Sequence, residues 1–405
     1  MKILAISHIF PPAIDGGSKV VYKLGQYFES QKHQVLYLSS NCFSTDDFVN
    51  SKSIKTDSSY KNFIKLPVYN YLRRPLKFLN FFLPQKSYLY ELSKVFQKGP
   101  IFKLIPFIKT IIKITKFKPD LIIAGPLPTT IILYARFLKN LTRSKLLINA
   151  SFHQTDLDFF QLPLIKTLQK TDFLWTLTQY ETNFFIKKFN INPQKIILAG
   201  NGVDPEFIIK KNKIKKSTNH DSPSTILFIG NLSFHKRVDL LIKSFSSLIS
   251  KNLINQFTNK LIIVGQKTLF YPQLKKLYDS LDPQIKNKIK FKFNIITQKQ
   301  LIKTIDDCQF LVLPSIQESF GLVLIEAWAR SKPVITTNIP PLQELVTKSK
   351  GGLTFKIDDS VDLQKQIQKL LNNSKLCNKL GQNGLDYVKN NYTWKKVGQK
   401  ICQKI

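Results

Sequence analysis

Two glutamates eight positions apart, Glu318 and Glu326, stand in an otherwise apolar segment, LVLPSIQESFGLVLIEAWARSKPVITT at residues 311–337. The pattern predicts a strand, a polar loop that carries Glu318, and a helix that opens near Phe320 and Gly321. The N–H groups of that helix's first turn lack intrahelical partners and favour an anion such as a diphosphate. Carboxylates before and inside such a helix accept hydrogen bonds from sugar hydroxyls. For one glutamate alone a solvated helix face is the ordinary interpretation, but the pair favours a binding site.

The elements that position these residues follow a regular alternation. Short apolar runs alternate with helical segments along the chain, which is typical of βαβ units and a parallel sheet. The alternation breaks at residues 206–224, where Lys, Asn, Ser and Thr dominate, and then restarts. We therefore predict an α/β protein with two doubly wound, Rossmann-like domains at residues 1–205 and 225–385, joined by the linker 206–224. Ligands of such sheets bind outside the carboxyl ends of the strands.

The chain is strongly basic. Among 405 residues, 61 Lys plus Arg oppose 26 Asp plus Glu, which gives a formal net charge of +35. That charge attracts anionic surfaces such as phospholipid or RNA. Only six of the basic residues are Arg, however. Proteins that bind nucleic-acid phosphates and base edges favour Arg, because its guanidinium group donates two parallel hydrogen bonds. A nucleic-acid-binding protein stays as an alternative that lacks a recognised binding motif, and we expect no nucleic-acid partner.

A basic stretch at residues 61–118 holds 13 basic residues and one acid, Glu91, interleaved with Phe, Leu and Ile. Two interpretations stay open: a stretch that adsorbs to anionic lipid, or ordinary domain helices with a lysine-biased solvent face. Arg73 and Arg74 are also candidates for holding an acceptor phosphate. No apolar run reaches the roughly 20 residues of a bilayer span. We therefore predict no transmembrane helix, and a cytoplasmic protein with the inner face of the membrane as a candidate peripheral surface.

Around the paired glutamates the sequence resembles the family 4 glycosyltransferases of the GT-B fold, also called glycosyl transferases group 1. The family's two glutamates with seven intervening residues match Glu318 and Glu326. Glu344 in PPLQELV looks like the family's loop before a closing glycine pair, here Gly351 and Gly352. The resemblance implies two Rossmann-like domains facing each other across a cleft, the first for the acceptor and the second for the nucleotide sugar. A helix at residues 386–405 is implied to cross back to the first domain.

The resemblance extends over nearly the whole chain. ISHIFPPAIDGGSKVVYKLGQYF looks like the family's first strand, glycine loop and helix, and it contains Gly16 and Gly17 where the backbone approaches donor phosphate and sugar. ILFIGNLSFHKRVDLLIKSF looks like the strand, phosphate-binding loop and helix of the second domain. Lys236 there occupies the place of the family's diphosphate-binding lysine. In isolation, Lys236 reads as an ordinary surface lysine in a lysine-rich chain.

The resemblance implies specific roles for site residues. The implied catalytic residues are Glu318, which orients the donor hexose, His153, which touches the donor sugar, and Lys236, which stabilises the leaving diphosphate. Glu326 is implied to bind the ribose. The other implied donor-binding residues are Gly16, Gly17, Gly230, Asn231, Arg237, Ser319, Phe320, Gly321 and Leu322. The sequence does not identify the residues that bind the acceptor.

Two positions depart from the family pattern. Asn231 stands where the family usually has Arg, so one phosphate-binding fork is missing, and Arg237 is the candidate substitute. Ser331 replaces a common Gly, which concerns the end of a helix rather than the chemistry.

No metal and no cofactor are expected. Asp156 and Asp158 form a D-L-D that resembles the metal-binding motif of the other large glycosyltransferase fold. That motif normally ends an apolar strand directly, whereas polar residues from His153 to Thr155 intervene here. The four cysteines lie far apart, without zinc-ligand spacing, and are expected to be buried or free thiols.

The implied activity is retaining, metal-independent transfer of a hexose from a UDP- or GDP-linked donor. The implied acceptor is a glycan or a lipid-linked molecule in cell-envelope or polysaccharide synthesis. Because of Asn231, a weakly active or non-catalytic GT-B protein that binds nucleotide sugar or glycan stays as the alternative. Base recognition is expected to rest on backbone groups near Gly265 and residues 294–296. The sequence does not reveal the base, the hexose, the acceptor, the linkage or the oligomeric state.

Overall fold

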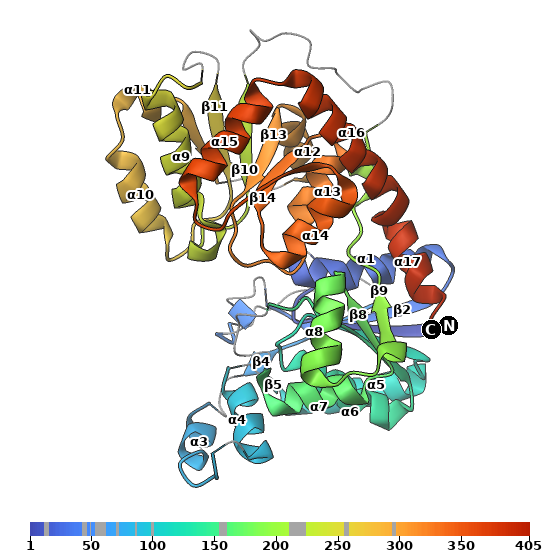
Figure 1. Cartoon of the computed structure of the whole chain (residues 1–405). Coiled ribbons are helices and arrows are strands. Elements are labelled where there is room, and N and C mark those ends of the chain that lie inside the picture. Colours follow the sequence, from blue (N-terminus) through green and yellow to red (C-terminus); the bar gives the residue numbers. More distant parts are fainter. Residues whose placement is uncertain are drawn as a thin grey trace. The chain divides into compact units, whose positions relative to one another are not determined.

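The computed structural model of the chain contains two compact units (Figure 1). The structure describes residues 1–11, 16–42, 47–48, 50–52, 62–69, 73–85, 87–98, 101–153, 160–209, 224–254, 259–293 and 297–405. The first unit contains Met1–Asn201 and Val397–Ile405, and the second contains Gly202–Lys396. Each unit has its own parallel sheet, which confirms the predicted α/β class with two Rossmann-like domains.

The first unit is built on a parallel sheet of seven strands in the order β3-β2-β1-β6-β7-β8-β9. In register, Ile3 lies opposite Val35 on one side and Leu121 on the other. The central strands are apolar at nearly every position, because helices cover both faces of a parallel sheet. The strands are β1 (Lys2–Ile6), β2 (Gln34–Ser40), β3 (Phe63–Leu66), β6 (Leu121–Ala124), β7 (Lys145–Asn149), β8 (Phe173–Thr176) and β9 (Ile196–Leu198), with a separate antiparallel pair β4 (Val68–Tyr69) and β5 (Ile101–Phe102).

The helices of the first unit pack on this sheet through apolar stripes. On α1, for example, Val20, Leu24 and Phe28 are fully buried, with the spacing of one helix face. The helices are α1 (Gly16–Ser30), α3 (Arg73–Leu79), α4 (Tyr88–Lys98), α5 (Leu104–Phe117), α6 (Ile131–Thr142), α7 (Leu162–Lys170) and α8 (Gln179–Phe189), with a short 3₁₀ turn η2 (Pro193–Lys195).

The second unit has a parallel sheet of six strands in the order β12-β11-β10-β13-β14-β15. Its strands are β10 (Thr225–Ile229), β11 (Lys260–Val264), β12 (Ile289–Lys292), β13 (Phe310–Leu313), β14 (Val334–Thr337) and β15 (Gly352–Phe355). Its helices are α9 (Val238–Ser250), α10 (Tyr271–Asp279), α11 (Pro283–Lys286), α12 (Gln298–Asp306), α13 (Leu322–Ala329), α14 (Pro340–Ser349), α15 (Ser360–Leu371) and α16 (Ser374–Asn391), with 3₁₀ turns η3 (Pro205–Phe207) and η5 (Phe234–Lys236). The last helix, α17 (Trp394–Cys402), begins in the second unit and ends in the first.

The boundary between the units lies earlier than residue 205. The N–H of Val203 donates to Tyr392 O at 2.7 Å, and the N–H of Ile209 donates to Ala329 O at 2.9 Å. The buried Arg330 donates to Phe207 O and forms a two-point ion pair with Asp306. These bonds attach residues 202–209 to the second unit, and the compact units divide after Asn201. Residues 210–223, most of the predicted linker, lie outside the described residues.

The predicted crossing helix at residues 386–405 is divided in the structure. Helix α16 ends at Asn391, and α17 starts at Trp394. In α17, Val397 and Ile401 are fully buried within the first unit. A side chain at Gly398 would meet the Tyr27 ring at 2.2 Å, so this glycine lets α17 pack closely. No helix among the described residues is long and apolar enough to cross a membrane.

All four cysteines are free thiols, as expected from the sequence. Cys42, Cys308 and Cys377 are buried, whereas Cys402 is exposed. Burial raises the pKa of the Cys308 and Cys377 thiols to about 12 in each case. Both therefore stay protonated and unreactive at neutral pH.

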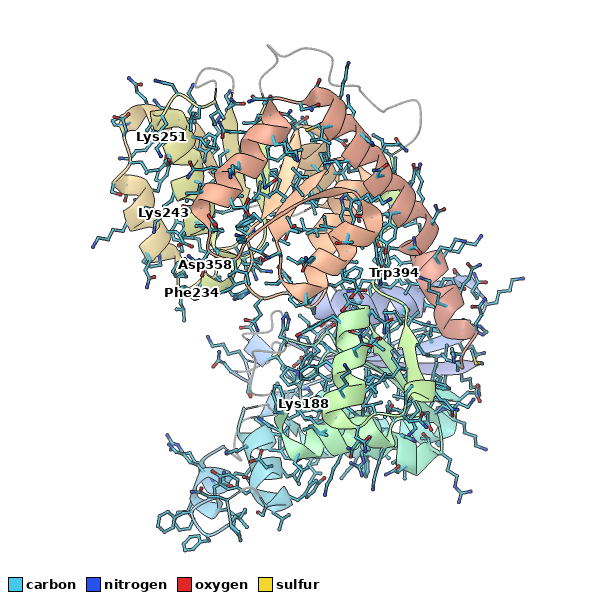
Figure 2. The ribbon with its side chains drawn as sticks, viewed as in Figure 1. Lys188, Phe234, Lys243, Lys251, Asp358 and Trp394 are labelled. Atoms are coloured by element: carbon cyan, nitrogen blue, oxygen red, sulfur yellow. The ribbon has the colours of Figure 1, made fainter. Side chains whose placement is uncertain are left out.

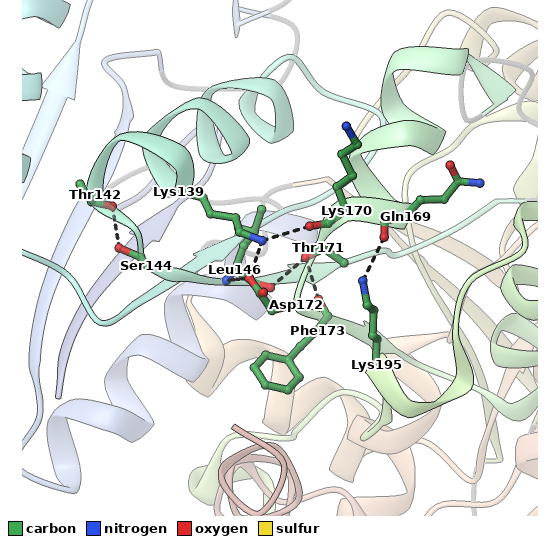
Figure 3. Close-up of polar contacts among 10 residues, drawn as sticks. All are labelled: Lys139, Thr142, Ser144, Leu146, Gln169, Lys170, Thr171, Asp172, Phe173 and Lys195. Atoms are coloured by element: carbon green, nitrogen blue, oxygen red, sulfur yellow. Dashed lines mark hydrogen bonds and ion pairs between the residues drawn. The ribbon is translucent and has the colours of Figure 1, made fainter.

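A polar network joins the amino ends of β7 and β8 in the first unit (Figure 3). The Asp172 carboxylate accepts from the buried Leu146 N–H at 2.8 Å and lies 2.7 Å from Lys139 Nζ. The Thr171 hydroxyl donates to Leu146 O at 2.8 Å. Because these bonds lie at the amino ends of the strands, they stabilise the sheet and leave the opposite edge to the functional loops.

Asp172→Ala is expected to lower the free energy of unfolding of the first unit by roughly 1 to 3 kcal/mol, because the substitution leaves the buried Leu146 N–H without its charged acceptor. Scanning calorimetry measures the change. Glu91→Ala is the control, because Glu91 makes a looser i,i+3 pair with Lys94 in the same unit and its loss costs at most about 1 kcal/mol. Equal stability of the two variants would contradict the role given to Asp172.

Candidate functional site

The strongest candidate site lies at the carboxyl ends of β10 and β13 in the second unit. Strand β13 ends at Leu313, a loop carries Glu318 and Ser319, and α13 follows from Leu322. Gly321 caps this helix with φ +77°, a left-handed conformation that favours glycine. The N-cap residue Gly321 has no side chain that could cap α13, and no acid stands in the first turn of this helix. The positive end of the helix dipole therefore faces the loop that carries Glu318, an arrangement that favours an anion.

The neighbouring loop from β10 to α9 carries Lys236. It starts at Gly230, whose N–H donates to Val264 O at 2.9 Å, and the Leu232 N–H donates to Gln266 O at 3.0 Å. A Cβ atom at Gly265 would lie 1.8 Å from Gly230 O, so only glycine fits where this loop passes β11. The close approach of Gly265 to Gly230 sets the path of the lysine loop. The expected contact of this region with a nucleotide base stays a prediction.

The two loops meet through an ion pair between Lys236 Nζ and Glu318 Oε1. Both side chains are largely buried, with 18% of Lys236 and 10% of Glu318 exposed. A backbone bond from the Ile316 N–H to His235 O at 2.9 Å joins the loops a second time. The structure thus brings together a cation and a carboxylate that lie 82 residues apart in sequence.

Arg237, the candidate substitute for the missing arginine at position 231, already has two carboxylate partners. Its guanidinium forms ion pairs with Asp239 and Asp358. Figure 2 labels Asp358 beside Phe234, over whose ring the Arg237 guanidinium lies at 5.7 Å. A phosphate would have to compete with these carboxylates. Asn231 itself is exposed, and donor binding by either residue stays a prediction.

Glu326 lies on α13, half-buried, among fully buried neighbours. Phe320 and Leu322 flank the helix start: Phe320 is buried with its ring edge-on to Tyr392 at 5.2 Å, and Leu322 is the first helical residue. Phe320 therefore contributes packing, and any ligand contact at this residue falls to its backbone. Glu344 forms an i,i+4 ion pair with Lys348 on α14.

Gly351 and Gly352 have steric reasons for lacking a side chain. A Cβ atom at Gly351 would lie 2.7 Å from Trp328 Nε1, which donates to Gly351 O, and one at Gly352 would lie 2.3 Å from Val334 O. This glycine pair therefore lets the start of β15 pack against α13 and β14.

The remaining predicted residues belong to the first unit. Gly16 and Gly17 form the first turn of α1, and a Cβ atom at Gly17 would lie 2.6 Å from Pro126 Cγ. Close approach to Pro126 is thus one reason for glycine at position 17. His153 is half-buried in the loop after β7.

Glu181, which the sequence did not single out, positions the loop that carries His153. This buried carboxylate accepts from the N–H of Phe152 at 2.8 Å and from the N–H of Leu177. Thr178 caps α8 by accepting from the Glu181 N–H. The spacing Thr-x-x-Glu just after an apolar run is a helix-start signal that could have revealed it.

Some predictions fall outside the described residues, namely Asp156, Asp158 and residues 294–296. Among the residues that are described, no group of three or more His, Cys, Asp or Glu is arranged to hold a metal ion.

Comparison with known proteins finds a family match within the second unit. Residues 209–386 match the family "Glycosyl transferases group 1". An uncharacterized glycosyltransferase of Methanocaldococcus jannaschii is 30% identical over 249 residues, which are 58% of this chain and 66% of the relative. The capsular polysaccharide biosynthesis glycosyltransferase CapM of Staphylococcus aureus is 25% identical over 209 residues, 50% of this chain and 52% of the relative. These matches thus span between half and two thirds of each relative's length.

Solved structures agree on the fold. The Anabaena protein HepE, crystallised in complex with UDP-glucose, has a TM-score of 0.70 and 15% identity, with 100% of this chain and 98% of that chain covered. Structural neighbours of this kind have the GT-B fold, which confirms the predicted fold class.

Gly265→Ala is expected to lower the free energy of unfolding of the second unit by roughly 1 to 3 kcal/mol or more, because the added methyl overlaps a backbone oxygen that cannot rotate away. Gln266→Ala is the adjacent control, since its side chain is exposed. Calorimetric unfolding that is the same for both variants would show that the lysine loop does not depend on the close approach.

Proposed function

Because residues 209–386 match the family "Glycosyl transferases group 1", we propose that the chain transfers a hexose from a nucleotide sugar to an acceptor. The donor is UDP- or GDP-linked, and the acceptor is a glycan or a lipid-linked molecule in cell-envelope or polysaccharide synthesis. The second unit binds the donor, and the first unit binds the acceptor. The named activities of the relatives, among them capsular polysaccharide biosynthesis in Staphylococcus aureus, support this assignment.

The observation that carries the proposal is the Lys236–Glu318 ion pair beside the uncapped start of α13. When the bond between hexose and diphosphate breaks, negative charge grows on the leaving diphosphate. Lys236 and the first N–H groups of α13 are a fixed cation and fixed dipoles suited to that charge. Because both are held by the fold before the donor arrives, little reorganisation is needed at the moment of reaction.

Glu318 and Glu326 bind different parts of the donor. Glu318 accepts hydrogen bonds from hexose hydroxyls, and its contact with Lys236 places the sugar next to the diphosphate. Glu326, eight residues further along α13, accepts from the ribose hydroxyls. In the first unit, His153 contacts the hexose. The backbone at Gly16 and Gly17 approaches the donor phosphate and sugar. Asn231, Arg237, Ser319 and the backbone from Phe320 to Leu322 complete the donor contacts.

We further propose that transfer retains the anomeric configuration and needs neither a metal nor a cofactor. In this scheme Lys236 and the α13 dipole supply the positive charge that a divalent cation would otherwise bring to the diphosphate. The four free thiols fit a reducing compartment, so we place the reaction in the cytoplasm. The complex of HepE with UDP-glucose favours a UDP-linked donor as the first to test.

Lys236→Met is expected to lower kcat for donor turnover by about 10²- to 10³-fold, because one preorganised positive contact to the leaving group is lost. The measurement is release of UDP or GDP from UDP-glucose, UDP-galactose and GDP-mannose by the purified full chain. Glu326→Gln is expected to act mainly through KM, since the ribose contact is the same in ground and transition states.

Lys243→Met is the matched control, because Lys243 is an exposed lysine on α9 in the same unit (Figure 2). Equal turnover by the Lys236 and Lys243 variants would refute the role of the ion pair. Donor binding without turnover by the wild type would instead identify a non-catalytic sugar-nucleotide-binding protein.

A further inference from the structure

Exposed apolar side chains are concentrated in one part of the first unit. Of the nineteen large apolar side chains that are exposed among the described residues, twelve fall between Tyr69 and Leu141. Three of them are exposed over more than two thirds of their surface: Phe81 is 86% exposed, Phe78 71% and Ile105 69%. Monomeric proteins rarely expose such a cluster unless it docks on something.

Helix α5 has an amphiphilic outer surface. Leu104, Ile108 and Ile112 are exposed at i, i+4 and i+8, so they form a row along the helix. The adjacent row is Ile105, Lys109 and Lys113, also exposed. The opposite side of α5 carries the buried Phe107, Thr110 and Ile114. The helix contains no acid, so the outer surface combines aliphatic groups with positive charge alone.

Helix α6 continues this surface. Phe137 and Leu141 are exposed on α6, and the Phe137 ring lies 6.3 Å from that of Phe107 on α5. An apolar hollow of about 240 Å³ lies between α4, α5 and α6. Its lining consists of Phe96, Phe107, Leu133, Tyr134 and Phe137.

The end of α3 forms a second apolar group. Phe78, Phe81 and Phe82 are exposed, and the Phe82 ring contacts the other two edge-on at 5.3 and 5.4 Å. Arg74 and Lys77 of the same helix are exposed beside them. Aromatic rings next to basic groups suit the headgroup region of a bilayer.

These helices form one continuous layer of the first unit. Helix α3 packs against α4, α4 against α7, α7 against α6, and α6 against α5. Figure 1 draws them along one side of that unit. We call the exposed apolar and basic side chains of α3, α5 and α6 the amphiphilic face.

We propose that the amphiphilic face docks on an anionic phospholipid bilayer. The apolar rows enter the boundary between headgroups and acyl chains, while Lys109, Lys113, Arg74 and Lys77 contact lipid phosphates. An anionic bilayer offers acyl chains to the apolar side chains and phosphates to the basic ones. Because a bilayer is fluid, it needs no surface shaped to the exposed helices. Docking decides between the two interpretations of the stretch 61–118 that the sequence left open, and it is independent of the donor chemistry proposed above.

Flotation of the purified full chain with phospholipid vesicles that contain no glycolipid tests the proposal. Binding is expected with vesicles in which about a third of the phosphatidylcholine is replaced by phosphatidylglycerol, and weaker binding with phosphatidylcholine alone or at high salt. Lys109→Glu with Lys113→Glu should weaken binding at least about 30-fold. Ile108→Asn with Ile112→Asn should weaken it about tenfold or more at constant charge.

Matched variants in the second unit separate this face from the general charge of +35. Lys369→Glu with Lys375→Glu changes the net charge equally at exposed positions of α15 and α16. Leu269→Asn with Val361→Asn removes exposed apolar groups. All four double variants alter exposed residues, and unchanged thermal unfolding verifies that each is folded. Equal loss of binding in face and control variants would overturn the proposal. So would absence of binding to anionic vesicles, or dimerisation through this face that the Ile108/Ile112 variant abolishes.

Discussion

The contact between Lys236 and Glu318 is the interaction on which the account of the site depends. Its two side chains come from different βα loops, 82 residues apart, and meet because β10 and β13 are neighbours in a parallel sheet. Parallel strands bring the loops at their carboxyl ends to one edge. The bond from Ile316 N–H to His235 O then holds the two loops together, and the close approach of Gly265 to Gly230 fixes the path of the loop that carries Lys236.

The need to hold these two loops in place explains why many positions around the site are glycines or tightly packed apolar residues. Gly321 takes a left-handed conformation where the chain turns into α13, and Gly351 contacts Trp328, whose indole donates to its carbonyl. These contacts hold α13 against the sheet, so the helix presents its first N–H groups in a fixed direction. A charge that develops on a bound diphosphate thus meets dipoles that are already oriented.

The alternation of apolar runs and the paired glutamates were enough to predict the parallel sheets and the strand, loop and helix around Glu318. The compact units divide after Asn201 rather than after residue 205, because bonds from Val203 and Ile209 to distant carbonyls attach this segment to the second unit. The pairing of Arg237 with Asp358 could not be predicted, because it depends on a contact between residues 121 positions apart. The Thr-x-x-Glu spacing predicts a helix start at Glu181, but not that its carboxylate accepts from the Phe152 N–H of another loop. In the same way, charge counting identified a basic stretch, but only the structure shows which of its apolar residues face outward.

Equilibrium binding of UDP and GDP to the full chain, measured by calorimetric titration for the wild type, Lys236→Met and Lys243→Met, tests the central claim most directly. The account predicts that the wild type binds one of the two nucleotides. Lys236→Met should lose about 1.5 to 3 kcal/mol of that binding, because a hydrogen bond to a charged group is removed, while Lys243→Met should match the wild type. Equal affinity of the wild type and Lys236→Met, or no binding of either nucleotide by the wild type, would contradict it.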